Sequence, residues 1–184
     1  MGHDKALLEL QGQPLLLRAV ELLRPQVAEV TLLGPLDRYA RFGIAILADR
    51  QAGRGPLAAL CRGLEYSRHD WNIFLACDLP FLDGRFLDFL VRRALAGSAD
   101  AVVPCTPDGW QPLCAAYHRR CLPRMQPAVA KTDAGIVDVL KGLAVDAVRG
   151  DQVAAVGLSE EIFTNINTVE DWEAVQHRLE RKPA

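Results

Sequence analysis

The chain lacks a strong charge of either sign, a long apolar run and any closely spaced cysteine pair. Its 184 residues carry 21 lysines and arginines against 23 aspartates and glutamates, a formal net charge of −2. A general nucleic-acid binder is usually basic, so this balance argues against that class. No apolar run reaches the roughly 18 residues of a membrane-crossing helix. The first ten residues, MGHDKALLEL, carry charges where a signal peptide has its apolar stretch. We therefore expect no nucleic acid and no membrane among its partners.

The five cysteines are odd in number and form no CxxC pair. This pattern fits neither a disulfide framework nor a zinc ribbon. Four of them, Cys61, Cys77, Cys105 and Cys114, have apolar neighbours in the sequence. We predict that these four are small buried thiols in a protein of the reducing cytoplasm.

Short apolar runs alternate with stretches of helical periodicity. About half of the residues are apolar and 24% are charged, which is enough for an ordinary core. The alternation predicts a single α/β domain over residues 1–180, a three-layer α/β/α sandwich with a Rossmann-like, mostly parallel sheet, followed by a disordered tail over residues 181–184. The expected strands are Val30–Leu33, Ile44–Ala48, Asn72–Cys77, Ala101–Pro104 and Leu113–Tyr117. The expected helices are Pro14–Leu23, Pro56–Tyr66, Asp83–Ala96, Asp133–Leu140 and Val169–Leu179.

Two of the expected strands end in an aspartate that opens a loop. In such folds, ligands bind beyond the carboxyl ends of the strands, so Asp49 and Asp78 are candidates for one cleft. The Leu-Pro that follows Asp78 restricts its backbone. A carboxylate there can hold Mg²⁺, which takes oxygen ligands. The alternative is that Asp78 only caps the next turn.

A second candidate is the glycine-bearing loop over residues 53–57. Its glycines allow backbone N–H groups to approach a ligand, and a helix start favours anions. The same residues also make a plain turn before a helix with proline at its first position. Lys5 is the third candidate, since a lysine there can neutralise a phosphate. A lone lysine near a terminus is more often a solvated charge.

Asn165 and Asn167 stand two residues apart in an extended segment, so their side chains point the same way. They can bind a sugar or a metal-bound phosphate. The alternative is local turn chemistry that leads into the Thr168 helix cap, and it explains Asn167 better than Asn165.

Five segments resemble, in order, motifs of the molybdenum cofactor guanylyltransferases. These enzymes belong to the MobA-like nucleotidyltransferases, whose fold is that of the nucleotide-diphospho-sugar transferases. The resemblance covers nearly the whole chain. The segments are MGHDKALLELQGQPLL, ADRQAGRGPLAAL, LACDLPFL, GWQPLCAAYHRRCL and FTNINTVEDW.

The resemblance implies an enzyme that transfers GMP from GTP to the phosphate of a molybdenum-pterin cofactor and releases pyrophosphate. Lys5 would contact the nucleotide phosphates and Asp78 would hold Mg²⁺, the two acting as catalytic residues. The guanine nucleotide would be held by Asp49 and by the loop residues Gly55, Pro56 and Leu57. The finished cofactor would pass to molybdoenzymes or to cofactor-delivery proteins.

The same resemblance places other residues on the acceptor side. Asn165 and Asn167 match asparagines near the pterin and the metal. The segment Gln111–Leu113 resembles one that leads into a strand beside the acceptor. Our own reading adds Arg119 and Arg120 as positive charge for the acceptor phosphate.

One departure from the family pattern stands out. The family signature begins with a strand and a glycine-rich loop before its Met-Gly-x-Asp-Lys, and this sequence starts at that methionine. The resemblance therefore implies that the first strand is missing from the chain as given, which would expose two inner sheet edges. A misassigned start, a truncation and a loss of nucleotide binding compete as explanations. We favour a misassigned start, because the other motif residues are present.

Two other functions stay open. A cytidylyltransferase, or another nucleotidyltransferase of the same group, would use the same metal-binding aspartate. A non-catalytic module that binds the molybdenum pterin would keep the fold without the transfer.

Overall fold

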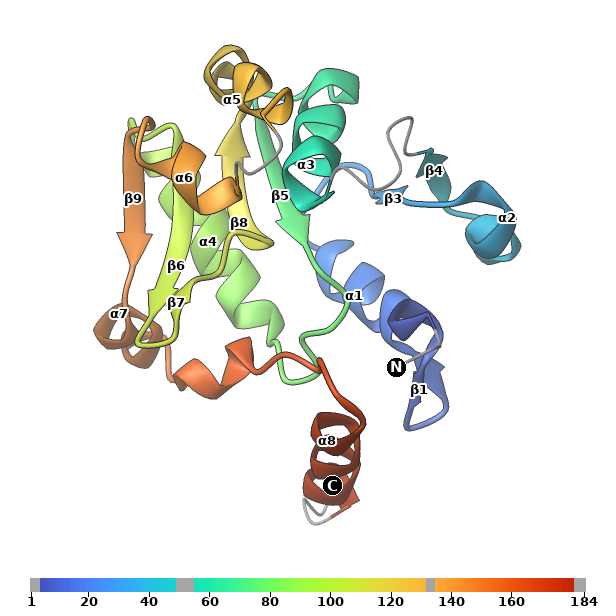
Figure 1. Ribbon diagram of the computed structural model, residues 1–184. Helices are drawn as coiled ribbons and strands as arrows, with labels where there is room; N and C mark the ends of the chain where they lie inside the picture. The colour runs from blue at the N-terminus through green and yellow to red at the C-terminus, as the bar shows by residue number, and fades with distance from the viewer. Residues whose placement is uncertain (1–3, 49–54, 132–134, 181–184) are drawn as a thin grey trace.

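The structure is a computed structural model that describes residues 4–48, 55–131 and 135–180. Strands and helices alternate over most of its length (Figure 1). The strands are β1 (Glu9–Leu10), β2 (Gln13–Pro14), β3 (Thr31–Leu33), β4 (Ala45–Leu47), β5 (Trp71–Leu75), β6 (Ala101–Thr106), β7 (Gly109–Trp110), β8 (Cys114–His118) and β9 (Val145–Val148). The helices are α1 (Leu15–Leu23), α2 (Leu36–Tyr39), α3 (Gly55–Tyr66), α4 (Gly84–Ala96), α5 (Leu122–Val129), α6 (Ile136–Leu140), α7 (Gly150–Ala155) and α8 (Val169–Glu180).

The larger sheet has the strand order β5-β8-β6, with β9 and the short β7 both paired to β6. β8 is antiparallel to both β5 and β6, so these two run in the same direction, and β9 is parallel to β6. The expectation of a mostly parallel sheet therefore holds for the main strands, but the sheet is mixed. β8 runs against its neighbours because the short β7 turn returns the chain beside β6.

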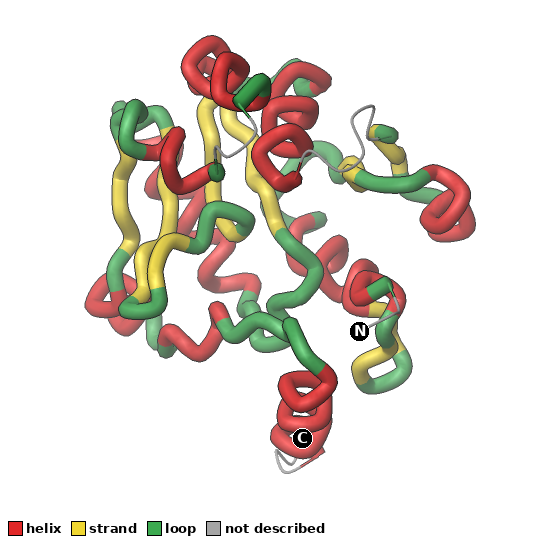
Figure 2. The backbone as a smooth tube through the Cα atoms, viewed as in Figure 1, coloured by secondary structure: helices red, strands yellow, loops and turns green. Residues whose placement is uncertain are grey.

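A second, parallel pair of strands, β3 and β4, lies beside the larger sheet (Figure 2). The segments that precede β3 and β5 contact each other. The carboxylate of Glu29, before β3, lies 3.1 Å from Nε2 of His69, before β5. The segments that follow the two strands both reach the segment of Asp4 and Lys5. Tyr39, after β3, donates a hydrogen bond to the Asp4 carboxylate, and Asp78, after β5, lies close enough to Lys5 for their charges to interact. β3 and β5 therefore run in the same direction, although no backbone hydrogen bond joins them within the described ranges.

Helices cover both faces of the sheet, which gives three layers. Alternate residues of the central strands separate the two faces, because successive side chains of a strand point to opposite sides. Phe74 and Tyr117 face a core shared with α3, α5 and α6. Val102 and Ala116 face a core shared with α4 and α7. A further apolar cluster joins the β1–β2 hairpin and the start of α1 to α8.

The local signals in the sequence explain several boundaries. Asp83 caps α4, since its carboxylate accepts a hydrogen bond from the Arg85 N–H at 2.8 Å. At α8, Thr168 Oγ1 accepts from the Asp171 N–H at 3.1 Å, and the Asp171 carboxylate accepts from the Thr168 N–H at 2.8 Å. This reciprocal pair is the capping box that the sequence predicts.

Most expected elements are present with shifts of one or two residues at their ends. The start of the helix expected over Asp133–Leu140 and the expected tail over residues 181–184 lie outside the described residues. β9 was not predicted, because Asp146 interrupts its apolar run and pairs with Arg93 at 2.6 Å. The short α2 and α7 and the proline-containing α5 were not predicted either, because they are too short or too irregular for a clear helical period.

All five cysteines are free. Cys61 and Cys114 are buried as predicted, but the prediction was wrong for Cys77 and Cys105, which are half-buried. Cys77 lies beyond the last residue of β5, and Cys105 lies near the end of β6. Cys121, left out of the prediction, is buried. No helix among the described residues is long and apolar enough to cross a membrane.

Candidate active site

Asp78 lies just beyond the carboxyl end of β5. The segment that carries it is fixed on two sides by backbone hydrogen bonds. Ala76 N–H donates to the Leu113 carbonyl at 2.7 Å, and the Asp78 carbonyl accepts from the Ile166 N–H at 3.0 Å. Segments from β5, from the start of β8 and from the C-terminal region therefore meet at this residue.

The Asp78 carboxylate is largely removed from water. Its Oδ1 atom is buried and has no hydrogen-bond partner among the described residues. Burial raises the pKa of this carboxyl group above its ordinary value, while a backbone hydrogen bond and the charge of Lys5 act in the opposite direction. A buried carboxylate oxygen without a partner is costly unless a cation or a hydrogen-bond donor completes it.

Lys5 supplies a positive charge beside this carboxylate. Its Nζ donates to Asn167 Oδ1 at 3.1 Å, across 162 positions of sequence. The structure thus brings together three of the predicted site residues, Lys5, Asp78 and Asn167. The asparagine holds the ammonium group of Lys5 without neutralising its charge, so the charge stays available for an anion.

The backbone that presents Lys5 is fixed by Asp4. Its carboxylate caps a short 3-10 helix over Lys5–Leu7 by accepting from the Ala6 N–H at 3.2 Å. It also accepts from the Tyr39 hydroxyl at 3.0 Å and pairs with Arg38 at 3.3 Å. Burial, together with this hydrogen bond, raises the pKa of Tyr39 to about 12. Tyr39 therefore stays protonated and acts as a fixed donor that positions the lysine-bearing turn.

The two asparagines differ in role. Asn167 is exposed and turned toward Lys5, and its N–H donates to the Asp171 carboxylate at 2.8 Å. Asn165 is half-buried, and its side-chain Nδ2 donates to the Phe163 carbonyl at 3.2 Å. Asn165 thus shares the segment with Asn167, while its own side chain hydrogen-bonds within that segment.

The structure describes three residues of the glycine-bearing loop, Gly55, Pro56 and Leu57, which form the start of α3. The rest of the loop and Asp49 lie outside the described residues. Gly55 has φ +74°, and a Cβ atom there would meet nothing within 4 Å. Pro56 is exposed, whereas the Leu57 side chain is 3% exposed and belongs to the core. Only the backbone of Leu57 is therefore available to a nucleotide.

α3 begins near the level at which β5 ends. It runs back along the sheet to reach the start of β5, so its first turn lies toward the carboxyl ends of the strands (Figure 1). Its 12 residues span about 18 Å and the five residues of β5 about 17 Å, so the two elements match in length.

Two further expectations have opposite outcomes. Gln111–Leu113 leads into β8 at the edge that carries Asp78, as expected, because Leu75 at the end of β5 pairs with Cys114. The prediction for Arg119 and Arg120 was wrong. They follow the far end of β8, at the opposite edge of the sheet, because β8 runs antiparallel to β5.

Both arginines serve the fold. Arg120 Nε donates to the buried Asp100 carboxylate at 2.7 Å, and Arg119 Nε donates to the Leu64 carbonyl at 3.4 Å.

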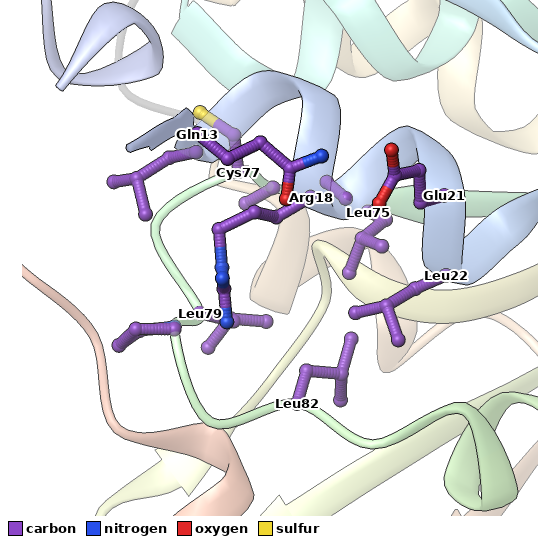
Figure 3. A pocket seen from close by; sticks show the side chains of 12 residues that line it. Gln13, Arg18, Glu21, Leu22, Leu75, Cys77, Leu79 and Leu82 are labelled. Atoms are coloured by element: carbon purple, nitrogen blue, oxygen red, sulfur yellow. The ribbon is translucent and has the colours of Figure 1, made fainter. Parts of the chain in front are cut away.

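A hollow of about 260 Å³ adjoins the Asp78 segment, between α1 and the chain over residues 75–82. Its wall is mostly apolar, and its polar side chains are Gln13, Arg18 and Glu21. Figure 3 shows the Arg18 side chain extending from α1 across the hollow toward Leu79. Arg18 has no ion pair with any carboxylate among the described residues. This hollow was not predicted from the sequence, where its signal was a cation, Arg18, within the apolar run of α1.

The chemistry of the Asp78 side chain fits a magnesium ion. No group of three or more histidine, cysteine or acidic side chains that could hold a metal occurs within the described ranges. Mg²⁺ needs only one or two protein carboxylates when phosphates and water supply its other ligands. A single buried carboxylate next to Lys5 matches that requirement.

Comparison with known proteins assigns a family to this geometry. Residues 1–149 match the model of the MobA-like NTP transferase domain. The chain belongs to the MobA-like NTP transferase family. As a member of that family it is a nucleotidyltransferase, and Lys5, Asp78 and the start of α3 lie within the matched part.

Relatives of this MobA-like transferase share most of its length. A protein of Pseudomonas putida, named molybdenum cofactor guanylyltransferase, is 32% identical over 172 residues, which cover 92% of this chain and 86% of that protein. A protein of Bacillus cereus, named probable molybdenum cofactor guanylyltransferase, is 28% identical over 187 residues, covering 98% of this chain and 92% of the relative.

Solved structures agree with the fold. Molybdopterin-guanine dinucleotide biosynthesis protein A of Archaeoglobus fulgidus superposes with a TM-score of 0.81 at 20% identity, over 98% of this chain and 93% of that one. The 2-C-methyl-D-erythritol 4-phosphate cytidylyltransferase of Thermus thermophilus gives 0.71 at 17% identity, over 96% and 94%. The predicted three-layer nucleotide-diphospho-sugar transferase fold is thereby confirmed.

Proposed function

We propose that this MobA-like transferase moves GMP from GTP to the phosphate of a molybdenum-pterin cofactor, with Mg²⁺ held by Asp78. The observation that carries the proposal is the buried Asp78 oxygen, which has no partner in the described part of the chain and lies beside the Lys5 ammonium group. This pair offers an oxygen ligand for a cation and a positive charge for phosphate oxygens at one point of the sheet edge.

In the proposed reaction, an oxygen of the acceptor phosphate attacks the α-phosphorus of GTP. The bond between that phosphorus and the bridging oxygen to the β-phosphate breaks, and pyrophosphate leaves. A phosphate nucleophile is already ionised at neutral pH, so the protein has little base catalysis to supply. Positioning and charge stabilisation remain as its main tasks.

Each residue of the site has a proposed role in this reaction. Lys5 neutralises charge on the transferred and departing phosphates, and Asn167 keeps its Nζ in place. The first turn of α3, opened by Gly55 and Pro56, presents backbone N–H groups to the nucleotide. When bound at Asp78, Mg²⁺ stabilises the charge that develops on the phosphate oxygens. Asp49 and Asn165 complete the proposed substrate-binding set on the evidence of their motifs.

The hollow beside the Asp78 segment suits the acceptor. Its apolar wall can cover a flat heterocycle, and Arg18 can meet a phosphate. We place the product in the cytoplasm, where it would pass to a molybdoenzyme or a cofactor-delivery protein.

The direct test is a transfer assay with α-labelled GTP, the molybdenum-pterin acceptor and Mg²⁺, which follows the labelled dinucleotide and the pyrophosphate. The proposal expects both products in equal amounts, with GTP preferred over CTP and ATP. Preference for CTP would move the enzyme to the cytidylyl branch. Binding without turnover would indicate a non-catalytic pterin-binding module.

Lys5→Ala is the informative variant. Loss of a cation that acts on the developing phosphate charge should lower kcat/KM by about 100-fold or more. Lys141→Ala is its control, since Lys141 pairs with the nearby Asp138 at 2.8 Å, on an exposed helix end. Equal activity of the two variants would remove Lys5 from the mechanism.

A further inference from the structure

Three donors meet at the Asp4 carboxylate, and Arg38 is the most exposed of them. The Ala6 N–H donates to this carboxylate at 3.2 Å and the Tyr39 hydroxyl at 3.0 Å, and both of these residues are buried. The third donor is Arg38 Nη1, at 3.3 Å. The Arg38 side chain is 58% exposed, whereas that of Asp4 is 18% exposed. Arg38 therefore lies on the solvent side of the carboxylate that fixes the lysine-bearing turn.

The backbone that carries Arg38 is held in place by its neighbour Tyr39. α2, which contains both residues, follows the carboxyl end of β3, and ligands bind beyond the carboxyl ends of strands in such folds. The Tyr39 ring packs so closely on Gly34 that a Cβ atom there would lie 2.6 Å from the ring. Its hydroxyl group is fixed at the same time by Asp4. The fold thus presents Arg38 at a defined place beside the site.

The Asp4 carboxylate and the Asp78 carboxylate border one space. Asp4, Lys5 and Asp78 line the same hollow, of about 640 Å³. Cys77 lies within electrostatic reach of both carboxylates, since burial raises its pKa to about 11 and the charges of Asp78 and Asp4 add to that rise. The guanidinium group of Arg38, paired with Asp4, therefore brings a second positive charge into the neighbourhood of Lys5.

Most of the Arg38 guanidinium group is open to a ligand. Arginine has several N–H donors in a planar fork, and within the described residues only Nη1 of Arg38 has an acceptor. The Asp4 carboxylate keeps its bonds from Ala6 and Tyr39 if Arg38 turns toward a ligand. A guanidinium group binds phosphate oxygens through two parallel hydrogen bonds. A phosphate group is therefore the ligand that suits the open donors.

The triphosphate of a nucleotide gives this second cation a task. It carries several negative charges, and a further charge develops on the oxygen between the α- and β-phosphates as the bond to the α-phosphorus breaks. Lys5 also faces Asp78, whose negative charge offsets part of its own. A cation beside the β- and γ-phosphates would stabilise the group that leaves.

We propose that Arg38 binds the β- and γ-phosphates of the nucleotide and then the departing pyrophosphate, while Asp4 orients its guanidinium group. When the bond to the α-phosphorus breaks, the bridging oxygen keeps the electron pair and becomes an oxygen of pyrophosphate. Arg38 stabilises this charge from the β3 side of the site. The inference rests on the proposed placement of the nucleotide phosphates beside Lys5, but it is independent of the base and of the acceptor.

The test is calorimetric titration of the full chain with pyrophosphate and, separately, with GMP, each with Mg²⁺. Arg38→Ala should weaken pyrophosphate binding by about tenfold or more, because hydrogen bonds to a charged group are lost. It should leave GMP binding nearly unchanged, because GMP lacks the β- and γ-phosphates. Arg38→Lys should restore only part of the affinity for pyrophosphate, since an ammonium group lacks the planar fork.

Arg41→Ala is the matched control. Arg41 lies in the short helical turn that follows α2, and its guanidinium carbon stands 4.9 Å from the centre of the Phe42 ring. Its removal changes the net charge by the same amount as Arg38→Ala, and it should leave pyrophosphate binding unchanged. Equal weakening by the two variants would show a general effect of charge and would overturn the proposal.

Lys5→Ala in the same titration separates this proposal from the proposed function. If Lys5→Ala weakens pyrophosphate binding and Arg38→Ala does not, the role of Arg38 is refuted and the proposed function stands. Equal weakening of GMP and pyrophosphate binding by Arg38→Ala would show that Arg38 acts only by holding the Asp4 turn, which also refutes it. If Lys5→Ala has no effect, or the wild type binds no pyrophosphate, the phosphates do not lie beside Lys5 and both proposals fail.

Discussion

At the scale of single residues, the site depends on the buried carboxylate of Asp78. Asp78 has a buried oxygen that finds no partner within residues 4–48, 55–131 and 135–180, and burial raises its pKa. Such a group costs stability in the unliganded protein. A site poised for ligand binding often carries strain or desolvation of this kind.

Asp78→Asn should therefore stabilise the protein while it removes activity. Without metal, we expect Tm to rise by about 2–4 °C, because each kcal/mol relieved is worth roughly that shift in a chain of this size. The transfer rate should fall by about 100-fold or more. Calorimetry and the transfer assay measure the two effects.

The matched control is Asp138→Asn, at an exposed carboxylate that pairs with Lys141. It should leave both Tm and rate nearly unchanged. A fall in Tm for Asp78→Asn would show that the carboxylate is satisfied in the free protein.

At the scale of elements, Asp100 joins β6 to the chain that follows β8. Its carboxylate is 9% exposed and accepts from Arg120 at 2.7 Å and from Arg124 at 2.6 Å. It also accepts from the Ala144 N–H at 3.0 Å, before β9. The Ala144 N–H and the two guanidinium groups hold the pKa of Asp100 below its usual range.

Asp100→Asn should cost about 2–3 kcal/mol of unfolding free energy at neutral pH, since a neutral amide replaces a buried carboxylate that accepts from two guanidinium groups and a backbone N–H. The folded-state pKa lies below the unfolded one. The contribution is therefore present above the unfolded value, near 4, and is lost as the pH falls through the folded value. Urea unfolding at several pH values should show the wild type and the variant converging below pH 4.

Asp88→Asn is the comparison for that experiment. Asp88 pairs with Arg92 on the exposed face of α4. Its loss should cost under about 0.5 kcal/mol with no such pH dependence.

The start of α3 carries a prediction of its own. Gly55 and Gly43 both have positive φ, +74° and +65°, with open space where a Cβ would stand. Substitution of either by alanine should cost about 1 kcal/mol, because alanine is strained in that region. Only Gly55→Ala should also weaken GTP binding, measured by calorimetric titration. Equal loss of binding in Gly43→Ala would show that the effect is general destabilisation.

The elements also show how far the sequence could be read. Capping residues such as Asp83 and Thr168, and continuous apolar runs such as β5, were predictable because their signals are local. The direction of β8 was not predictable, since it depends on a two-residue strand, β7, that has no periodicity to detect. That direction places Arg119 and Arg120 at the wrong edge for a phosphate, which no local pattern reveals. The Lys5–Asn167 contact was not predicted, because it joins residues 162 positions apart and no local pattern links them.

At the scale of the whole molecule, the site is assembled from both ends of the sequence. The Ile166 N–H holds the Asp78 carbonyl, Asn167 holds Lys5, and α8 packs on the β1–β2 hairpin. A ligand that bridges these segments should stabilise the fold as a unit, because it binds only the folded state.

GTP with Mg²⁺ should therefore raise Tm in a concentration-dependent manner. At 100 times Kd the stabilisation is about 2.7 kcal/mol, which corresponds to roughly 5–11 °C for a chain of this size. CTP and ATP at the same concentration should give smaller shifts if guanine is recognised. Equal shifts for the three nucleotides would indicate that the protein reads only the phosphates.

The free cysteines can report local opening of the folded protein. Burial raises the pKa of Cys61 and Cys77 to about 11 and that of Cys114 and Cys121 to about 12. At neutral pH these groups are thiols, which alkylating reagents attack slowly. Cys61 and Cys121 lie in the core on the α3 side of the sheet and Cys114 in the core on the α4 side, so the order in which iodoacetamide labels them shows which side of the molecule opens first.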